Sequence, residues 1–155
     1  MMSQTVEYAL RAMRYLASLD GAPVNCQTIA AQTRVPPGYL SKVMRDLVVA
    51  QLVTSFRGPN GGFVLARPPE QITMLDVVNA VDPIVRIQAC PVGDPRHVRL
   101  CALHQRLDDA LAAIERTFRE ATLAEMLRSD GEQGQCCAIL PPGDVTLERQ
   151  RRHGT

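Results

Sequence analysis

The sequence lacks several features that would place it in other classes of protein. No apolar run approaches the roughly 20 residues needed to cross a bilayer, so we expect no transmembrane segment and no membrane partner. The N-terminus shows no charged-then-apolar signal design, which indicates a cytoplasmic protein. There is also no C-x-x-C pair, no nucleotide-binding glycine fingerprint and no acid–base constellation. We therefore expect the protein not to be an enzyme.

The number of cysteines is small and odd. The chain has five cysteines and no secretory signal, so a disulfide framework is not expected. Any cysteines that cluster are instead candidates for metal binding or redox sensing.

Lysine is nearly absent, and the positive charge is unevenly spread. Sixteen of the seventeen cationic side chains are Arg, which is suited to bidentate contacts with phosphate and guanine. Residues 1–69 carry a net charge of +4, whereas residues 70–155 carry −3. A basic first half fits contacts with DNA phosphates, although so modest an excess does not establish them.

The first half of the chain predicts a helix–turn–helix. Helical spacing of apolar residues predicts a helix over about 3–19, and Asn25 can cap a second helix over 26–33. Pro37 suits the first position of a third helix, where its missing N–H costs nothing. The buried stripe expected on this third helix is Leu40, Val43, Met44, Leu47 and Val48.

A short β-hairpin is predicted directly after the third helix. Residues 52–56 and 63–66 have strand-forming composition, and the stretch between them is nearly all Gly, Pro and Asn. Arg57 stands just before this turn, and Arg67 follows the returning strand. A positively charged hairpin after a helix–turn–helix is a wing, and a winged helix is most often a DNA-reading device.

The third helix and the wing carry the predicted DNA contacts. A recognition helix enters the major groove, where fork-shaped donors and aromatic groups read base edges. Arg57 can enter the adjacent minor groove, and Gly61 lets the wing backbone approach phosphates. The predicted DNA-binding residues are Tyr39, Ser41, Lys42, Arg45, Arg57 and Gly61. The alternative is a protein-interaction module whose exposed polar residues are only solvated.

The second half predicts a helix, a loop and one long helix. Thr73 and Asp76 form a capping box for the fourth helix, which ends the winged-helix domain, 1–82. Residues 83–99 form a loop that could carry a cofactor, and a long helix covers about 100–128.

The long helix carries an apolar stripe with nothing in the sequence to cover it. Because a solitary helix gains little stability, we expect a partner helix from a second subunit to bury this stripe. The stripe consists of Leu103, Leu107, Leu111, Ile114, Phe118 and Ala121. Composition predicts a disordered tail over 129–155.

Three motifs resemble the Rrf-two (Rrf2) family of bacterial winged-helix regulators. They are PGYLSK at 37–42, RGPNGGFVLARP at 57–68 and ITMLDVVNAVD at 72–82. The family includes the iron–sulfur and nitric-oxide sensing members IscR, NsrR and RirA. The resemblance covers about 2–128. It implies a mainly α fold with a small β-hairpin wing, and a homodimer, built by the long C-terminal helix, that binds a near-palindromic double-stranded DNA operator.

Four potential metal ligands lie around the start of the long helix. Cys90, His97, Cys101 and His104 form the pattern C-x6-H-x3-C-x2-H, and the last two lie on one helical face. Thiolates with imidazoles are ligands for zinc or for an iron–sulfur centre. Alternatively, the cysteines are small apolar residues, and His104 caps the helix or pairs with Asp108.

The resemblance implies an iron–sulfur cluster in this loop. Redox-sensing members carry three cysteines there, and some add a histidine; Cys90, Cys101 and His104 match these positions. The middle cysteine is absent, and His97 lies in its neighbourhood. This departure favours a two-iron (2Fe-2S) cluster with mixed ligands over a four-iron (4Fe-4S) one. Glu7 stands where some relatives supply a carboxylate ligand from the partner's first helix.

The function predicted from the sequence is that of a dimeric transcription regulator, most simply a repressor. Its operator affinity is expected to depend on a redox- or nitric-oxide-responsive iron–sulfur cluster. A regulator that holds zinc, or that uses a cysteine thiol switch, remains the alternative.

Overall fold

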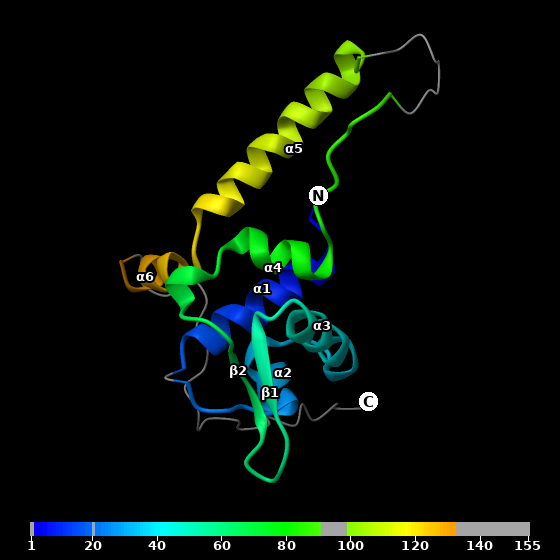
Figure 1. Cartoon of the computed structure of the whole chain (residues 1–155). Helices are drawn as coiled ribbons and strands as arrows, with labels where there is room; N and C mark the ends of the chain where they lie inside the picture. The colour runs from blue at the N-terminus through cyan, green and yellow to red at the C-terminus, as the bar shows by residue number, and fades with distance from the viewer. Residues whose placement is uncertain (1, 20, 91–98, 133–155) are drawn as a thin grey trace, which may run out of the picture.

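A computed structural model describes residues 2–19, 21–90 and 99–132, with side chains to 128 (Figure 1). In the described chain one long helix extends away from the other helices and the hairpin. We call these other elements together the head. In chain order the elements are α1 (Gln4–Ala17), α2 (Cys26–Thr33), α3 (Pro37–Val49), β1 (Val53–Phe56), β2 (Gly62–Leu65), the 3-10 helix η1 (Pro69–Gln71), α4 (Met74–Val81), α5 (Ala102–Glu120) and α6 (Leu123–Glu132). The predicted mainly α fold with a small hairpin is confirmed.

The helix–turn–helix is delimited by local signals. The Asn25 side chain accepts a hydrogen bond from the Thr28 N–H at 2.8 Å and so begins α2. Arg34, with φ of 55°, ends α2 in the left-handed conformation, and Pro37 occupies the first turn of α3. These caps confirm the predicted bounds of α2 and set the turn that orients α3.

The core lies where α1, α2 and α3 meet. Leu40, Val43, Met44 and Leu47 are buried as predicted, while Val48 is only half-buried. Burial of each such side chain contributes about 1.5–3 kcal/mol. One face of α3 is thereby committed to the core, and its opposite face is left to solvent.

The hairpin pairs in an antiparallel register that runs from Val53–Leu65 to Phe56–Gly62. Strand β2 is tied to the rest of the head near the turn, because Val24 and Phe63 exchange backbone hydrogen bonds of 3.1 and 2.8 Å. Figure 1 shows the tip of the hairpin projecting beyond the helices. The paired strands are therefore held against the rest of the head, and the turn beyond them, residues 57–60, is exposed.

The predicted capping box at the start of α4 is present. Thr73 Oγ1 accepts from the Asp76 N–H at 3.1 Å, and Asp76 Oδ2 accepts from the Thr73 N–H at 2.9 Å.

The prediction of one continuous helix over 100–128 was wrong. Helix α5 ends at Glu120, and Ala121 is extended. Thr122 and Glu125 then form a second capping box, with bonds of 2.9 and 3.2 Å, that begins α6. The break is also held from outside, because the Met74 N–H donates to the Ala121 carbonyl at 2.8 Å. Fully buried Leu123 then directs α6 back onto α1.

Helix α6 reaches Glu132 and so enters the segment predicted as a disordered tail. Residues 133–155, the remainder of that prediction, lie outside the described residues. Within the described ranges, no helix combines the length and apolarity that a bilayer crossing requires.

Candidate DNA-binding face and metal site

The outer face of α3 carries the polar residues predicted to read DNA. Ser41, Lys42 and Arg45 are all exposed, because the core takes the opposite side of the helix. The Ser41 hydroxyl donates to the Pro37 carbonyl at 3.1 Å and lies 3.7 Å from the Cys26 sulfur. The face therefore offers two cationic side chains and a hydroxyl already used within the protein.

Tyr39, also predicted as a DNA contact, is held by the first helix. Its hydroxyl lies 2.7 Å from the Thr5 hydroxyl, and its ring meets Tyr8 edge-to-face at 5.5 Å. It is 40% exposed. Tyr39 therefore connects the start of α3 to the first turns of α1, a role that the sequence reasoning missed.

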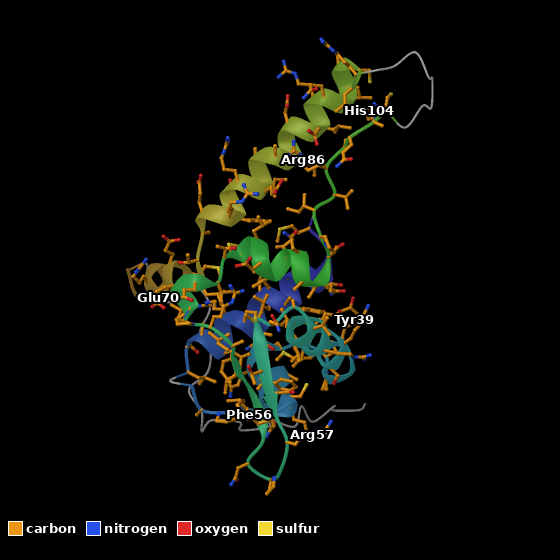
Figure 2. The ribbon with its side chains drawn as sticks, in the orientation of Figure 1. Tyr39, Phe56, Arg57, Glu70, Arg86 and His104 are labelled. Carbon is orange, nitrogen blue, oxygen red and sulfur yellow. The ribbon has the colours of Figure 1, made fainter. Side chains whose placement is uncertain are left out.

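The wing presents Arg57 and Phe56 to solvent, as Figure 2 shows near the hairpin. Gly61 is required in the turn for space. A Cβ there would overlap the Phe56 carbonyl oxygen and lie 2.8 Å from the carbonyl carbon of Arg57. This close packing of backbone brings the two strands back together.

Three of the predicted metal ligands meet at the N-terminal end of α5. Figure 2 labels one of them, His104, near this end of the helix. His104 Nδ1 lies 3.1 Å from the Cys101 sulfur and 3.5 Å from the Cys90 sulfur. All three potential ligand atoms lie within 4.8 Å of one another. Residues from the segment after α4 and from the start of α5 thus converge on one point.

The other two predicted ligands are His97 and Glu7. His97 lies outside the described residues. Glu7 is exposed on α1 and forms an ion pair with Arg11, one turn further along the same helix.

The environment of Cys101 favours its thiolate. Cys101 is the N-cap of α5, and a helix N-terminus stabilises negative charge. The backbone N–H and the imidazole of His104 lower the pKa of the Cys101 thiol to about 7. This thiol is therefore ionised more readily than an ordinary cysteine, and the thiolate is the form that binds metals.

The donor set fits a thiophilic metal centre. Two sulfurs and one imidazole nitrogen are typical ligands of zinc and of iron–sulfur clusters. Three protein ligands leave further coordination positions for a group from elsewhere. Zinc and iron are therefore both compatible with the geometry.

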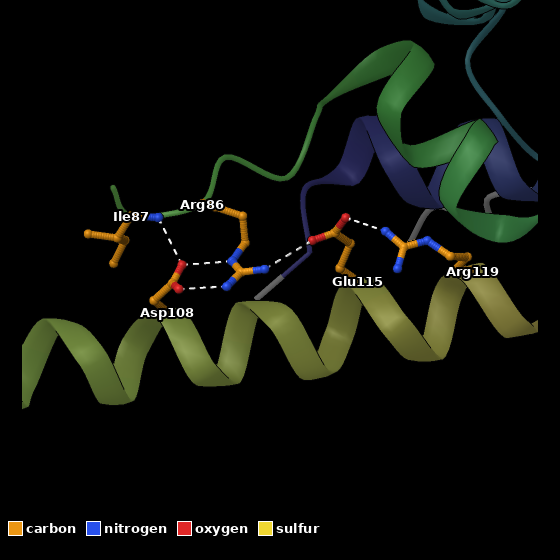
Figure 3. Close-up of polar contacts among 5 residues, drawn as sticks. All are labelled: Arg86, Ile87, Asp108, Glu115 and Arg119. Atoms are coloured by element: carbon orange, nitrogen blue, oxygen red, sulfur yellow. Dashed lines mark hydrogen bonds and ion pairs between the residues drawn. The ribbon is translucent and has the colours of Figure 1, made fainter. Parts of the chain in front are cut away.

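A polar network that the sequence reasoning missed lies next to this group (Figure 3). Arg86 donates to both carboxylate oxygens of Asp108, at 2.7 and 2.6 Å, and the Ile87 N–H donates to Asp108 Oδ1 at 2.9 Å. The alternative that Asp108 pairs with His104 was wrong. Arg86 holds the pKa of Asp108 at about 2. Asp108 also raises the pKa of Arg86 above its ordinary value.

Three residues of the apolar stripe of α5, Leu111, Ile114 and Phe118, line a groove of about 600 Å³. Leu103, Leu107 and Ile114 are exposed on this helix. The apolar residues that line the groove are Met2, Val6, Val78, Pro83, Ile84, Val85, Leu111, Ala113, Ile114 and Phe118. We call it the α5 groove.

Known proteins resemble this chain in sequence. The family profile described as "Rrf2: Iron-dependent Transcriptional regulator" matches residues 2–129. An HTH-type transcriptional regulator of Mycobacterium tuberculosis is 34% identical over 156 residues, which is 99% of this chain and 95% of the relative. One from Aquifex aeolicus is 30% identical over 129 residues, 81% of this chain and 90% of the relative.

Solved structures agree with these sequence matches. T. potens IscR superposes with a TM-score of 0.72 and 26% identity over 89% of this chain and 93% of its own. CymR of B. subtilis, described as the global cysteine regulator, superposes with a TM-score of 0.69. It is 25% identical, over 83% of this chain and 97% of its own. Because the profile matches nearly the whole chain and the winged helix is present, this chain belongs to the Rrf2 family of DNA-binding transcriptional regulators, which are not enzymes.

Proposed function

We propose that the protein is a homodimeric regulator whose affinity for a DNA operator depends on an iron–sulfur cluster. The observation that carries this proposal is the convergence of Cys90, Cys101 and His104, with all three donor atoms within 4.8 Å. The family's description as iron-dependent and the likeness to IscR support iron over other metals.

The donor set favours a two-iron cluster. Such a cluster takes four protein ligands, and imidazole can replace thiolate at part of the site. Cys90, Cys101 and His104 would supply three of these ligands. The fourth would be His97 or a Glu7 carboxylate from a second copy of the chain. A bound cluster would supply redox chemistry and reactivity towards nitric oxide.

Ligand binding at this point would tie two segments together. Cys90 lies on the segment that follows α4, whereas Cys101 and His104 lie at the start of α5. The other end of α5 is hydrogen-bonded to the start of α4 through Ala121 and Met74. A change at the ligands can therefore reach the head through α4 and α5, and an interface shift of 1–2 Å is about what switching proteins use.

On the DNA side, α3 would enter the major groove and the wing the minor groove. Lys42 and Arg45 are the exposed cations of α3, and Arg57 is the cation of the wing. Ser41 and Tyr39 would also contact the duplex, and the hydrogen bonds that both make within the protein would orient them. Gly61 would bring the wing backbone close to phosphates.

A second copy would cover the α5 groove. The groove is apolar, and exposed apolar side chains of α5 border it. Burial of such a patch is a common driving force for dimers. Two heads in a symmetric dimer would read two half-sites of one operator.

The cluster is tested by oxygen-free purification with visible spectroscopy and with iron and sulfide assays. We expect absorbance in the visible region, iron and acid-labile sulfide in the parent, and their loss in C90A and C101A. Duplex binding is then compared with and without the centre. A parent protein that holds neither iron nor sulfide when purified without oxygen would overturn the proposal.

The DNA-reading residues are tested by duplex binding at several salt concentrations. We expect K42A and R57A each to weaken binding and to reduce its dependence on salt, because each variant removes one cation from the surface that faces the duplex. R116A removes an exposed cation from α5 and serves as the charge-matched control. Binding by K42A and R57A equal to that of R116A would contradict the assignment.

The second candidate is a regulator that uses zinc or a thiol switch. The lowered pKa of Cys101 and the nearness of Cys90 favour it, because a thiolate beside a second thiol is suited to disulfide exchange. Metal analysis separates the candidates: one zinc per chain without sulfide indicates a zinc site, and no metal indicates a thiol switch.

A further inference from the structure

We propose that Arg86, Ile87 and Asp108 form a clamp that positions Cys90 against Cys101 and His104. The clamp would thereby determine how tightly the site holds a metal. This inference rests on the proposed function, because it concerns the same site. Arg86 and Asp108 are positioning residues, since neither belongs to the Cys/His group itself.

The clamp joins residues 83–90, which we call the linker, to the side of α5 (Figure 3). The Arg86 guanidinium meets the Asp108 carboxylate in a two-point contact of 2.7 and 2.6 Å. The Ile87 N–H adds a bond of 2.9 Å to the same carboxylate. A side chain of α5 therefore binds both a side chain and the backbone of the linker.

The clamp lies about one helical turn from the sulfurs. Asp108 is four residues beyond His104 on α5 and therefore shares its face. Ile87 is three residues before Cys90 on the linker. The linker and α5 thus run in opposite directions, with one contact at Asp108 and the next at His104.

This spacing makes the register of the linker critical. A slip of one residue in an extended segment moves it by about 3.3 Å. That displacement is comparable to the 3.5 Å between the Cys90 sulfur and His104 Nδ1. A one-residue slip would therefore remove Cys90 from the donor group.

The backbone of the linker is not held by secondary structure in the described chain, although Ile84 lines the α5 groove. Among the described residues, no backbone–backbone hydrogen bond joins 83–90 to another segment. Val85 of the linker is 78% exposed. The Ile87 N–H instead uses the Asp108 carboxylate as its acceptor.

Asp108 is well suited to this role. It is 8% exposed and is the buried residue of α5. Both of its oxygens are engaged, and a fork-to-fork contact with Arg sets orientation as well as distance. Arg86 also reaches Glu115 at 3.4 Å, and Glu115 accepts from Arg119 at 2.6 Å. Arg119 belongs to the same network but does not touch the linker, which makes it a matched control.

The test measures how close the two thiols are held in metal-free, full-length protein. Cys26, Cys136 and Cys137 are replaced by Ser, so that only Cys90 and Cys101 remain. Oxidised glutathione then takes two electrons from the two thiols, giving one protein disulfide and two reduced glutathione molecules. The two thiol protons pass to the glutathione thiols. The equilibrium constant of this exchange reports the effective concentration of one thiol at the other.

We expect R86A to lower this equilibrium constant about tenfold, because two charge-assisted hydrogen bonds are removed. D108A should lower it at least as much, because the Ile87 N–H also loses its acceptor. R86K should fall between R86A and the parent, since Lys keeps the charge but not the fork. D108N is the milder second variant, because its amide oxygen can still accept from Ile87. R119A should leave the constant within about twofold of the parent.

Zinc affinity, measured by competition with a chromophoric chelator, should follow the same order. Equal constants for the parent, R86A and D108A would overturn the clamp. Equal losses in R86A and R119A would also overturn it, because they would indicate a general effect on stability. If the parent binds neither iron nor zinc, the proposed function fails, whereas the glutathione equilibrium still decides on the clamp.

Discussion

The charge of the Asp108 carboxylate joins two segments of the described fold. Its carboxylate accepts from Arg86 and Ile87, and Arg86 holds its pKa at about 2. The pKa of an Asp side chain in an unfolded chain is about 3.9. A lowered folded pKa means that the stabilisation is fully present above the unfolded value. It is lost as the pH falls from about 4 towards about 2.

We therefore predict a difference between two neighbouring Asp variants in acid. In D108N, the free energy of unfolding should fall less steeply between pH 4 and pH 2 than in the parent, because the ion pair is already absent. D109N is the control, since exposed Asp109 accepts a hydrogen bond of 3.0 Å from Gln105 on the same helix. Urea unfolding at a series of pH values measures both. Identical slopes in D108N and the parent would contradict the prediction.

Two glycines of the DNA-binding head illustrate how an element depends on space. A Cβ at Gly61 would overlap backbone of the wing, whereas a Cβ at Gly38, in the first turn of α3, would meet nothing within 4 Å. We predict that G61A destabilises the protein by about 1–3 kcal/mol, since backbone must move. G38A should be neutral, or stabilising by up to about 1 kcal/mol, because Ala is the better helix former. Urea unfolding distinguishes them, and equal effects would exclude a packing role for Gly61.

The contact between α1 and α3 is also open to measurement. Tyr39 and Thr5 share one hydrogen bond at 2.7 Å across 34 positions of sequence. Removal of the hydroxyl in Y39F should cost about 0.5–1.5 kcal/mol of unfolding free energy. Y39F should cost less in a T5V background, because the partner of the hydroxyl is already absent. Additive losses in this double-mutant cycle would show that the bond contributes nothing.

At the level of elements, local signals could be predicted from the sequence and long-range registers could not. Asn25 and the Thr73–Asp76 pair are caps whose partners lie three residues away, so the sequence alone identifies them. The Thr122–Glu125 box is equally local, but it was hidden because apolar spacing continues through it. Its break is reinforced by Met74, which the sequence does not place nearby.

In the candidate metal site, too, local contacts could be predicted from the sequence and long-range contacts could not. Cys101 and His104 are one helical turn apart, so their proximity follows from spacing. The approach of Cys90 depends on how the linker lies against α5, which is determined by Arg86 and Asp108, 22 positions apart. No periodicity or motif encodes that pairing. For the same reason, the contact of Tyr39 with α1 could not be predicted from its place on α3.

At the scale of the whole molecule, the α5 groove is an apolar surface that a second copy of the chain could cover. Ile114 is 43% exposed and lines the groove, whereas Val49, at the end of α3, is 78% exposed and does not. If a second copy covers the groove, a charge introduced in the groove should destabilise the dimer. A charge introduced at an exposed residue outside the groove should not. A buried, unpaired carboxylate at a dimer interface is strongly unfavourable.

We therefore predict that I114D shifts the protein from dimer to monomer, while V49D leaves it dimeric. Sedimentation equilibrium should give twice the 17.0 kDa chain mass for the parent and V49D, and the single mass for I114D. I114D should also bind a two-half-site duplex much more weakly, because each monomer then binds a half-site by itself. The head of I114D should keep its helical content, since Ile114 lies on α5. A monomeric parent, or equal effects of the two Asp substitutions, would show that the groove is not the surface that joins two copies.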